Sequence, residues 1–150
     1  MAKEYVNKAS AAGRPVYAKT LERILKDKVC PFCEEYFLKY HTKPILKKGA
    51  HWIVTKNMSP YEGTKQHILF VHRGHIEDIA SLSPAAAAEL IKLASTYKKK
   101  YKLPGASLFM RTGDTNYTGA SVRHLHASLL SGTKSRPRGK AISVVLGYKK

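Results

Sequence analysis

The sequence predicts an α+β fold with about five β-strands and one main helix. Several short apolar or alternating stretches are bounded by glycine, proline and asparagine, as in strands, and residues 83–100 carry a complete helix signature. No internal repeat or domain linker interrupts the chain. A length of 150 residues suits one domain that buries about two thirds of the surface of its unfolded chain, so neither a metal nor a disulfide is obligatory for stability.

The first half of the chain contains one helix candidate and three strand candidates. Residues 1–18 favour no single element, whereas the polar, amphipathic stretch 20–28 is typical of a short helix. That helix leads into a cysteine pair, after which extended segments are expected. The strand candidates are residues 44–48 and 51–56, joined at Gly49, and residues 66–71, which follow a loop at 57–63 rich in Asn, Ser, Pro and Gly.

The second half begins with the clearest helix. Ser83 is a suitable N-cap, Pro84 suits the first helical position, and an alanine-rich stretch continues toward Lys100. A Leu-Pro-Gly break then ends the helical pattern. Beyond the break we expect a strand at 106–111, a loop at 112–119, a strand at 121–130, a mobile basic loop at 132–140 and a last strand at 141–147.

The chain is strongly basic, with 27 lysines and arginines, 10 acidic residues and a net charge of +17. Such a charge attracts polyanions: nucleic acid, nucleotides or an anionic membrane surface. A solvated surface explains the runs at 98–102 and 148–150 equally well. The apolar runs are far shorter than the roughly 18 residues of a membrane span, and the N-terminus lacks a signal-peptide core. We therefore expect a cytoplasmic protein without a membrane span.

The most informative segment is 121–131, in which His124 and His126 alternate with apolar residues. Residues two apart in a strand point to one face, so both imidazoles are expected in one pocket, while the alternating Leu125, Ala127 and Leu129 are buried on the other side. Two converging imidazoles can bind a metal, attack phosphorus or shuttle protons. Two partly buried core histidines remain the alternative.

The two cysteines, Cys30 and Cys33, have the spacing of a metal knuckle or a redox pair. A thioredoxin-like redox pair opens a helix after a buried strand, whereas here a polar helix candidate precedes it. Zinc is therefore favoured over redox chemistry. Because a structural zinc ion takes four protein ligands, two more are required, and His75 and His124 are the candidates.

Three motifs resemble the histidine triad superfamily of nucleotide hydrolases and transferases. Segment 124–130 is similar to its His-φ-His-φ-His-φ-φ signature (φ, apolar), except that Ser128 occupies the third His position. Segment 66–75 is similar to a second family block, Gly-His-x-φ-φ-φ-Pro-Lys-x-His, and segment 57–60 to the loop before the ribose pocket. The likeness covers residues 29–131.

The resemblance implies a histidine triad (HIT)-like fold: a largely antiparallel sheet of about five strands, a main helix and a two-fold homodimer. Residues 1–150 would form a single HIT-like domain. It would consist of an N-terminal arm with a short helix at 1–28, a motif-bearing core at 29–131, and a basic loop with the last strand at 132–150.

The resemblance also implies roles for individual residues. His126 occupies the position of the nucleophile, which attacks the α-phosphorus to form a nucleotidyl-histidine. His67 would touch phosphate or orient the leaving group, unless it is an ordinary strand histidine. Ser128 would make a shortened or water-bridged version of the contact that His or Gln makes in relatives. We therefore expect His126, His67 and Ser128 to be catalytic.

Five further positions are expected to bind the nucleotide or its phosphates. Ser121 matches a hydroxyl residue that hydrogen-bonds phosphate, and Asn57 stands where relatives carry a ribose-binding Asp, although both positions also suit ordinary turn or strand polar residues. Arg111 would clamp phosphate or merely point outward. Asn116 and Gly119, in the loop that precedes the histidine strand, complete the set.

Zinc-containing branches of the superfamily take four ligands from positions that are all occupied here, Cys30, Cys33, His75 and His124. The implied cofactor is a structural Zn²⁺ that fixes the segment aiming His126, with no Lewis-acid role.

The implied activity is that of a nucleotidyl hydrolase or transferase. It would cleave a phosphoanhydride or related bond at a nucleoside 5′-phosphate, with dinucleoside polyphosphate as the favoured substrate and hydrolysis and phosphorolysis both open. One alternative is a nucleic-acid-associated enzyme or binder, such as one that removes 5′-adenylate from DNA, with the basic loop around Arg136 and Arg138 holding phosphates. The other is a non-catalytic nucleotide-binding protein, because Ser128 replaces a triad histidine.

Overall fold

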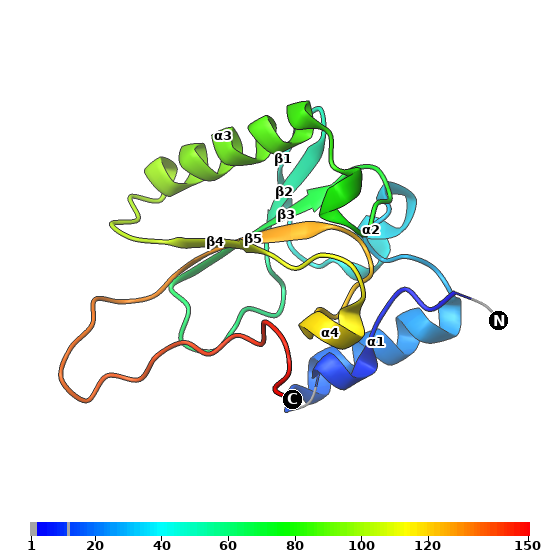
Figure 1. Cartoon of the computed structure of the whole chain (residues 1–150), viewed down its shortest axis with the longest axis horizontal. Helices are drawn as coiled ribbons and strands as arrows, with labels where there is room; N and C mark the ends of the chain where they lie inside the picture. The colour runs from blue at the N-terminus through cyan, green and yellow to red at the C-terminus, as the bar shows by residue number, and fades with distance from the viewer. Residues whose placement is uncertain (1–2, 12) are drawn as a thin grey trace.

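The computed structural model describes residues 3–11 and 13–150, so that residues 1, 2 and 12 of the expected N-terminal arm lie outside the described residues. The described chain is built around one sheet, with helices on both of its faces (Figure 1). In chain order the elements are η1 (Lys8–Ala11), α1 (Pro15–Asp27), α2 (Glu34–Tyr40), β1 (Ile45–Lys48), β2 (Trp52–Lys56), β3 (Gln66–His72), η2 (Ile79–Ser81), α3 (Pro84–Lys100), β4 (Ser107–Met110), α4 (Thr115–Thr118) and β5 (His126–Ser131).

The five strands are ordered β1-β2-β3-β5-β4, and every neighbouring pair is antiparallel. In the pairing of β3 with β5, Leu69 lies opposite Ser128 and Phe70 lies opposite Ala127. Opposed residues in an antiparallel pair point to the same face, so this register separates the apolar positions of β5 from its polar ones. The expected α+β class and antiparallel sheet are confirmed.

Helix α3 covers one face of the sheet (Figure 1). Its Leu90 and Leu93 pack in one buried cluster with Phe70, Ala127 and other residues of that face. The helix begins as the sequence predicts, because the Ser83 side chain accepts a hydrogen bond from the backbone N–H of Ala86 and Pro84 follows at the first helical position. Burial of Leu125, Ala127 and Leu129 against this cluster is confirmed as well.

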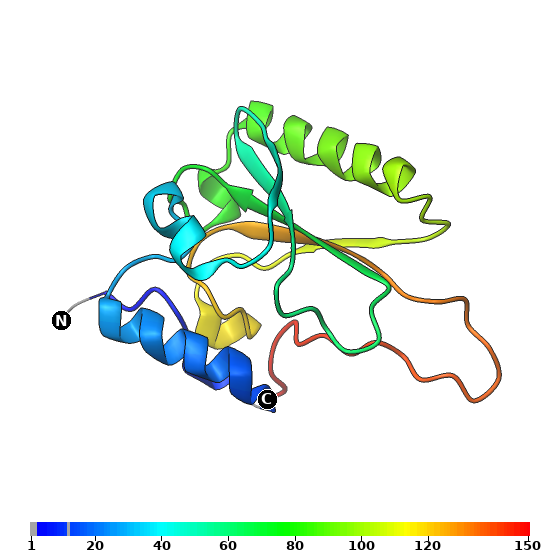
Figure 2. The ribbon, with the colours of Figure 1, turned by 180° about the vertical axis from the view of Figure 1, so that it is seen from behind.

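The opposite face is covered by α2 and by the N-terminal part of the chain (Figure 2). Phe37 of α2 packs against Ile53, Leu69 and Val71, with Phe32 at the border of this cluster. The arm is attached through Val6, which forms an isolated β-bridge with Val122. The candidate site lies on this second face.

Three helical segments differ from the sequence-based expectation. Helix α1 begins at Pro15 rather than at residue 20, because proline suits the first turn and the helix buries Leu21 and Ile24. Helix α2 replaces the expected extended segment, since acidic residues occupy its first turn while Phe37 and Tyr40, one turn apart, are buried. The expected loop at 112–119 contains the short helix α4, capped by the Asp114 side chain.

Two strand expectations are also corrected. The histidine strand begins at His126, since residues 121–123 pair with the arm through the isolated bridge at Val122 and Leu125 bonds to the Ile76 carbonyl outside the ladder of β5. Residues 141–147 form no strand: they are mostly exposed, and Arg111 Nη1 donates a 2.9 Å hydrogen bond to the Val145 carbonyl, which draws this tail back toward the body. The basic loop at 132–140 is irregular and exposed as expected, and its mobility stays a prediction.

Within the described residues, every helix is too short or too polar to cross a membrane.

Candidate active site and metal centre

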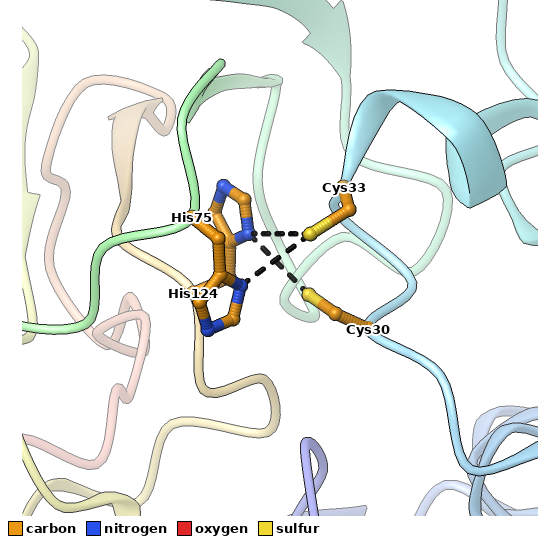
Figure 3. A group of neighbouring side chains, drawn as sticks. All are labelled: Cys30, Cys33, His75 and His124. Atoms are coloured by element: carbon orange, nitrogen blue, oxygen red, sulfur yellow. Dashed lines mark hydrogen bonds between the residues drawn. The ribbon is translucent and has the colours of Figure 1, made fainter.

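Two cysteines and two histidines converge from three segments of the chain (Figure 3). The Cys30 and Cys33 sulfurs come from the turn before α2, His75 from the segment after β3, and His124 from the segment before β5. Cys30 Sγ lies 3.3 Å from His124 Nδ1, and Cys33 Sγ lies 3.4 Å from His75 Nδ1. All four ligand atoms lie within 4.8 Å of one another. The ligand set expected from the sequence is therefore assembled.

This geometry fits a tetrahedral zinc ion. At ordinary zinc–sulfur and zinc–nitrogen distances, tetrahedral ligands stand about 3.5 Å apart, close to the separations found here. The outer nitrogens of both imidazoles are also held: His124 Nε2 donates to the His72 carbonyl and His75 Nε2 to Glu77 Oε1, 3.1 Å away. Such partners fix the tautomer that presents Nδ1 to the metal.

The thiols are unsuited to redox chemistry without a metal. Burial raises the pKa of the Cys30 thiol to about 12 and also raises the pKa of Cys33. A redox-active pair needs a lowered thiol pKa, whereas a buried thiol that becomes a metal ligand loses its proton on binding. The chemistry of the cluster thus favours a structural metal over a redox pair.

His124 and His126 do not share one pocket, contrary to the expectation from their spacing. His124 belongs to the Cys/His cluster, whereas His126 lines a cavity on the second face of the sheet. The ring of Phe32 lies edge-on to both, with centroids 6.1 Å from His124 and 5.1 Å from His126. Strand alternation does not apply, because the strand begins only at His126.

His126 is presented as a neutral base with a defined tautomer. Its Nδ1 lies 2.7 Å from the His124 carbonyl, to which it donates, so the lone pair is on Nε2. Burial lowers the pKa of His126 to about 4, with Arg111 adding to the effect and the bond to the His124 carbonyl opposing it. At neutral pH the imidazole is therefore uncharged and Nε2 is available as a nucleophile.

The cavity beside His126 contains most of the expected site. Its lining includes five of the expected residues, Asn57, Arg111, Ser121, His126 and Ser128. The cavity volume is about 50 Å³, far below the several hundred Å³ of an ordinary ligand pocket. A phosphate-sized group fits there, and a whole nucleotide requires the lining side chains to move.

His67 contacts two residues that line this cavity, Ser128 and Asn57. Its Nε2 lies 3.0 Å from Ser128 Oγ and 3.2 Å from Asn57 Nδ2. Because Asn57 Oδ1 accepts from the Ser59 backbone N–H, its Nδ2 is the group that donates to His67, whose Nε2 is then an acceptor. Burial lowers the pKa of His67 to about 4, with smaller contributions from His126, Arg111 and Arg14. His67, Ser128 and Asn57 thus form one uncharged network.

Of the remaining expected residues, Arg111 lines the cavity and Gly119 contacts Arg111, whereas Asn116 lies outside. Arg111 Nη2 donates to the Tyr61 hydroxyl at 2.8 Å, and its Nη1 lies 3.4 Å from the Gly119 carbonyl. Gly119 ends α4 with a φ of 72°, a left-handed conformation that favours glycine. Asn116 is exposed on α4, where its Oδ1 accepts from Asn7 Nδ2, and it does not contribute to the cavity lining.

Sequence reasoning missed the contribution of the N-terminal arm. Arg14 and Tyr17 line the cavity, together with Phe32 and His41 from the α2 region. The arm lies outside the segment that carries the family motifs, so no motif pointed to it. One local signal was present: Pro15 marks a helix start, which places Arg14 at the helix N-cap.

Solved structures with this fold are named as histidine triad proteins. A HIT family hydrolase from Clostridium thermocellum is 24% identical, with a TM-score of 0.55 over 73% of this chain and 95% of that one. A histidine triad protein from Clostridium difficile is 17% identical, with a TM-score of 0.56 over 73% and 96% of the two chains. A zinc-bound histidine triad family protein from Mycobacterium smegmatis is 15% identical, with a TM-score of 0.55 over 80% and 84%.

No protein-family model matches the sequence, and no curated protein matches it either. At these identities the structural likeness establishes the fold. The chain therefore has the histidine triad fold, with a Cys/His cluster suited to zinc beside a cavity that contains a neutral histidine.

Proposed function

We propose that this protein is a histidine triad nucleotidyl hydrolase or transferase that cleaves a phosphoanhydride or related bond at a nucleoside 5′-phosphate. The observation that supports this most is the state of His126: Nδ1–H is bonded to the His124 carbonyl, Nε2 is unprotonated, and the ring borders a cavity with Arg111 and two serine hydroxyls. These are the groups that nucleophilic attack on phosphorus requires.

In the proposed reaction His126 Nε2 attacks the α-phosphorus, forming an N–P bond as the bond to the leaving oxygen breaks. A polyphosphate leaving group departs as an anion and needs no proton. The imidazole, now bonded at both nitrogens, is cationic, and the His124 carbonyl stabilises it through Nδ1–H. Water or phosphate then attacks phosphorus, the N–P bond breaks, and neutral His126 is regenerated, with the proton of the attacking group passing to solvent.

The other cavity residues act on the phosphate oxygens in this proposal. The Ser121 hydroxyl rotates to donate to the α-phosphate oxygens, while Arg111 neutralises the charge that develops on the leaving phosphates. His67 positions Ser128 before substrate binds, through the 3.0 Å contact between Nε2 and Oγ, and the Ser128 hydroxyl then exchanges this contact for one to a phosphate oxygen. Asn57 would hold the ribose hydroxyls.

Cys30, Cys33, His75 and His124 would hold a structural Zn²⁺. When bound, the ion supplies rigidity rather than Lewis-acid chemistry, because four protein ligands complete its coordination. Since the His124 carbonyl also orients His126, the ligand set and the nucleophile are linked through one residue.

Dinucleoside polyphosphate is the favoured substrate, because the strongly basic chain and the arginine in the cavity both suit several phosphates. We further propose that residues 1–150 form a single cytoplasmic HIT-like domain that pairs into a homodimer. Light scattering on purified protein tests the dimer directly.

Product analysis with diadenosine tetraphosphate, with and without orthophosphate, tests the activity. AMP and ATP formed without phosphate would identify a hydrolase, whereas ADP and ATP formed only with phosphate would identify a phosphorylase. The matched control is His126→Ala, which should lose turnover and leave no nucleotidyl adduct detectable by mass spectrometry. Turnover that survives in this variant contradicts the proposed nucleophile. Binding without turnover in the wild type indicates a nucleotide-binding protein, and turnover of adenylated DNA ends alone would favour the nucleic-acid alternative.

A further inference from the structure

Two arginines from distant parts of the chain meet at the cavity beside His126. Arg14 precedes α1 in the N-terminal arm, and Arg111 follows β4. We propose that these two side chains form a clamp for the phosphates beyond the one that His126 attacks, which makes Arg14 a determinant of specificity for polyphosphate substrates. The inference rests on the proposed function and assigns its substrate class to particular residues.

The two guanidinium groups share one aromatic platform. Arg111 Nη2 donates a 2.8 Å hydrogen bond to the Tyr61 hydroxyl, and the Arg14 guanidinium lies 5.9 Å from the centroid of the Tyr61 ring. Arg14 also lies over Tyr17, 4.5 Å from its ring centroid. Both side chains line the cavity that contains His126 and Ser128. Two positive charges are therefore gathered at one end of the proposed reaction centre.

Neither guanidinium has an acidic partner among the described residues. Among residues 3–11 and 13–150, no carboxylate lies within ion-pair distance of Arg14 or Arg111. Their polar partners are neutral oxygens: the Ser10 carbonyl 3.2 Å from Arg14 Nη2, and the Val145 carbonyl 2.9 Å from Arg111 Nη1. Both charges also act on the site, since each lowers the pKa of His67. Neighbouring uncompensated cations favour an anionic ligand.

The ligand must bring more charge than one phosphate group supplies. The α-phosphate already has His126 and the Ser121 and Ser128 hydroxyls around it in the proposed reaction. Two further guanidinium groups suit two further phosphate groups, since each guanidinium can bond phosphate oxygens bidentately. Arg14 needs to give up only one carbonyl contact and its stacking to turn toward them. A substrate with one phosphorus atom would leave the hydrogen-bond donors of both guanidinium groups without a phosphate partner.

The test compares a substrate that has several phosphate groups with a substrate that has one phosphorus atom. Kcat/KM is measured for diadenosine tetraphosphate and for adenosine 5′-phosphoramidate in the wild type, Arg14→Gln and Arg23→Gln. Arg23 is the matched control, because it lies on α1 and stacks on Tyr40, 5.1 Å from the ring centroid, without lining the cavity. We expect Arg14→Gln to lower the tetraphosphate-to-phosphoramidate ratio by about tenfold or more, mainly through KM, as loss of a charged hydrogen bond does. Arg23→Gln should preserve the ratio.

Binding provides a second measurement that does not require turnover. Titration calorimetry with diadenosine tetraphosphate on His126→Ala, with and without Arg14→Gln, should show a loss of affinity of about tenfold. An unchanged affinity, or an equal loss of activity on both substrates, overturns the clamp even where His126 proves to be the nucleophile. Conversely, loss of affinity with no turnover in the wild type supports the clamp and contradicts the proposed catalysis. The measurements can therefore contradict the arginine clamp and the catalysis by His126 independently of each other.

Discussion

Ser128 stands where a third histidine would complete the motif, and in the proposed reaction its hydroxyl contacts a phosphate oxygen. Its Oγ is 3.0 Å from His67 Nε2, and the side chain is buried. We expect Ser128→Ala to lower kcat by about tenfold or more, since a contact made in the transition state is lost, and to destabilise the fold by about 1 kcal/mol. Steady-state kinetics and urea unfolding measure the two effects.

Ser131 is the matched control for this substitution. It is buried on the same strand, three residues away and therefore on the opposite face, and its Oγ has no hydrogen-bond partner among the described residues. Ser131→Ala should leave kcat unchanged. A similar loss in both variants would show that Ser128 acts through packing of β5.

The buried side chain of His41 should make the folding stability of the protein depend on pH. Burial lowers its pKa from 6.5 to about 4, helped by Lys43, and its Nε2 donates to Thr55 Oγ1 at 2.7 Å. Because the unfolded chain binds the proton more tightly, stability is complete above pH 6.5 and falls as the pH decreases toward 4. The loss attributable to this residue is at most about 3 kcal/mol.

His41→Gln isolates this contribution, because glutamine can keep a hydrogen bond to Thr55 and cannot become charged. Chemical unfolding of both proteins at several pH values gives the free energy of unfolding as a function of pH. Between pH 6.5 and 4 this free energy should fall less steeply in the variant than in the wild type. The metal ligands are identical in the two proteins, so their protonation cancels in the difference. Parallel curves would contradict the assignment to His41.

The residue motifs predicted the metal ligands better than they predicted the cavity. Cys30, Cys33, His75 and His124 are brought together as the sequence indicated, because their chemistry permits few other arrangements. The shared pocket for His124 and His126 was wrong, because it depended on a strand that began at Ser121, whereas the strand begins at His126. Arg14 reaches the site through tertiary packing of the arm, which local pattern does not encode.

At the scale of elements, the metal cluster ties the turn before α2 to the segments that flank β3 and β5. If Zn²⁺ occupies it, removal by a chelator should destabilise the protein by about 4 kcal/mol where free zinc exceeds its Kd about a thousandfold, lowering the Tm by roughly 10 °C. Activity should fall too, because the His124 carbonyl orients His126. Calorimetry and zinc content measured on one sample test this.

The Cys30→Ser/Cys33→Ser double variant is the control for chelation. It should contain no zinc, resemble the chelated wild type and show no further change when chelator is added. If the chelator lowers the Tm of the double variant by the same amount, the effect does not arise from this cluster.

Most strands and α3 were predictable because each has a local signature. Ser83 and Pro84 start α3, and the Gly49 turn separates β1 from β2. Helix α2 was not predictable to the same degree, since seven residues give too short a pattern and its apolar positions are decided by packing on Ile53 and Leu69. The tail at 141–147 has a strand-like composition, but Arg111 binds its Val145 carbonyl and the five-stranded sheet does not include it.

At the scale of the whole molecule, two of the basic clusters that contribute to the charge of +17 differ in how free they are to bind a ligand. Near the end of α3 the lysines are partly engaged: Lys98 Nζ donates to the Leu103 carbonyl, and Lys100 Nζ lies over the rings of Tyr97 and Tyr101. The basic loop at 132–140 is exposed throughout and projects from the body (Figure 1). Charges on such a loop are the better placed to contact a polyanion.

If the nucleic-acid alternative holds, we expect the loop to dominate binding to DNA. Affinity for a duplex of about 20 base pairs should fall steeply between roughly 50 and 200 mM salt, with a slope of about 0.9 logarithmic units for each phosphate contact. Replacing Lys134, Arg136 and Arg138 with glutamine should reduce that slope by up to about 2.7 logarithmic units, which corresponds to three phosphate contacts. Replacing Lys98, Lys99 and Lys100 removes the same charge from α3 and should reduce it less. Equal reductions, measured by fluorescence anisotropy, would assign DNA binding to the net charge of the protein and not to the loop.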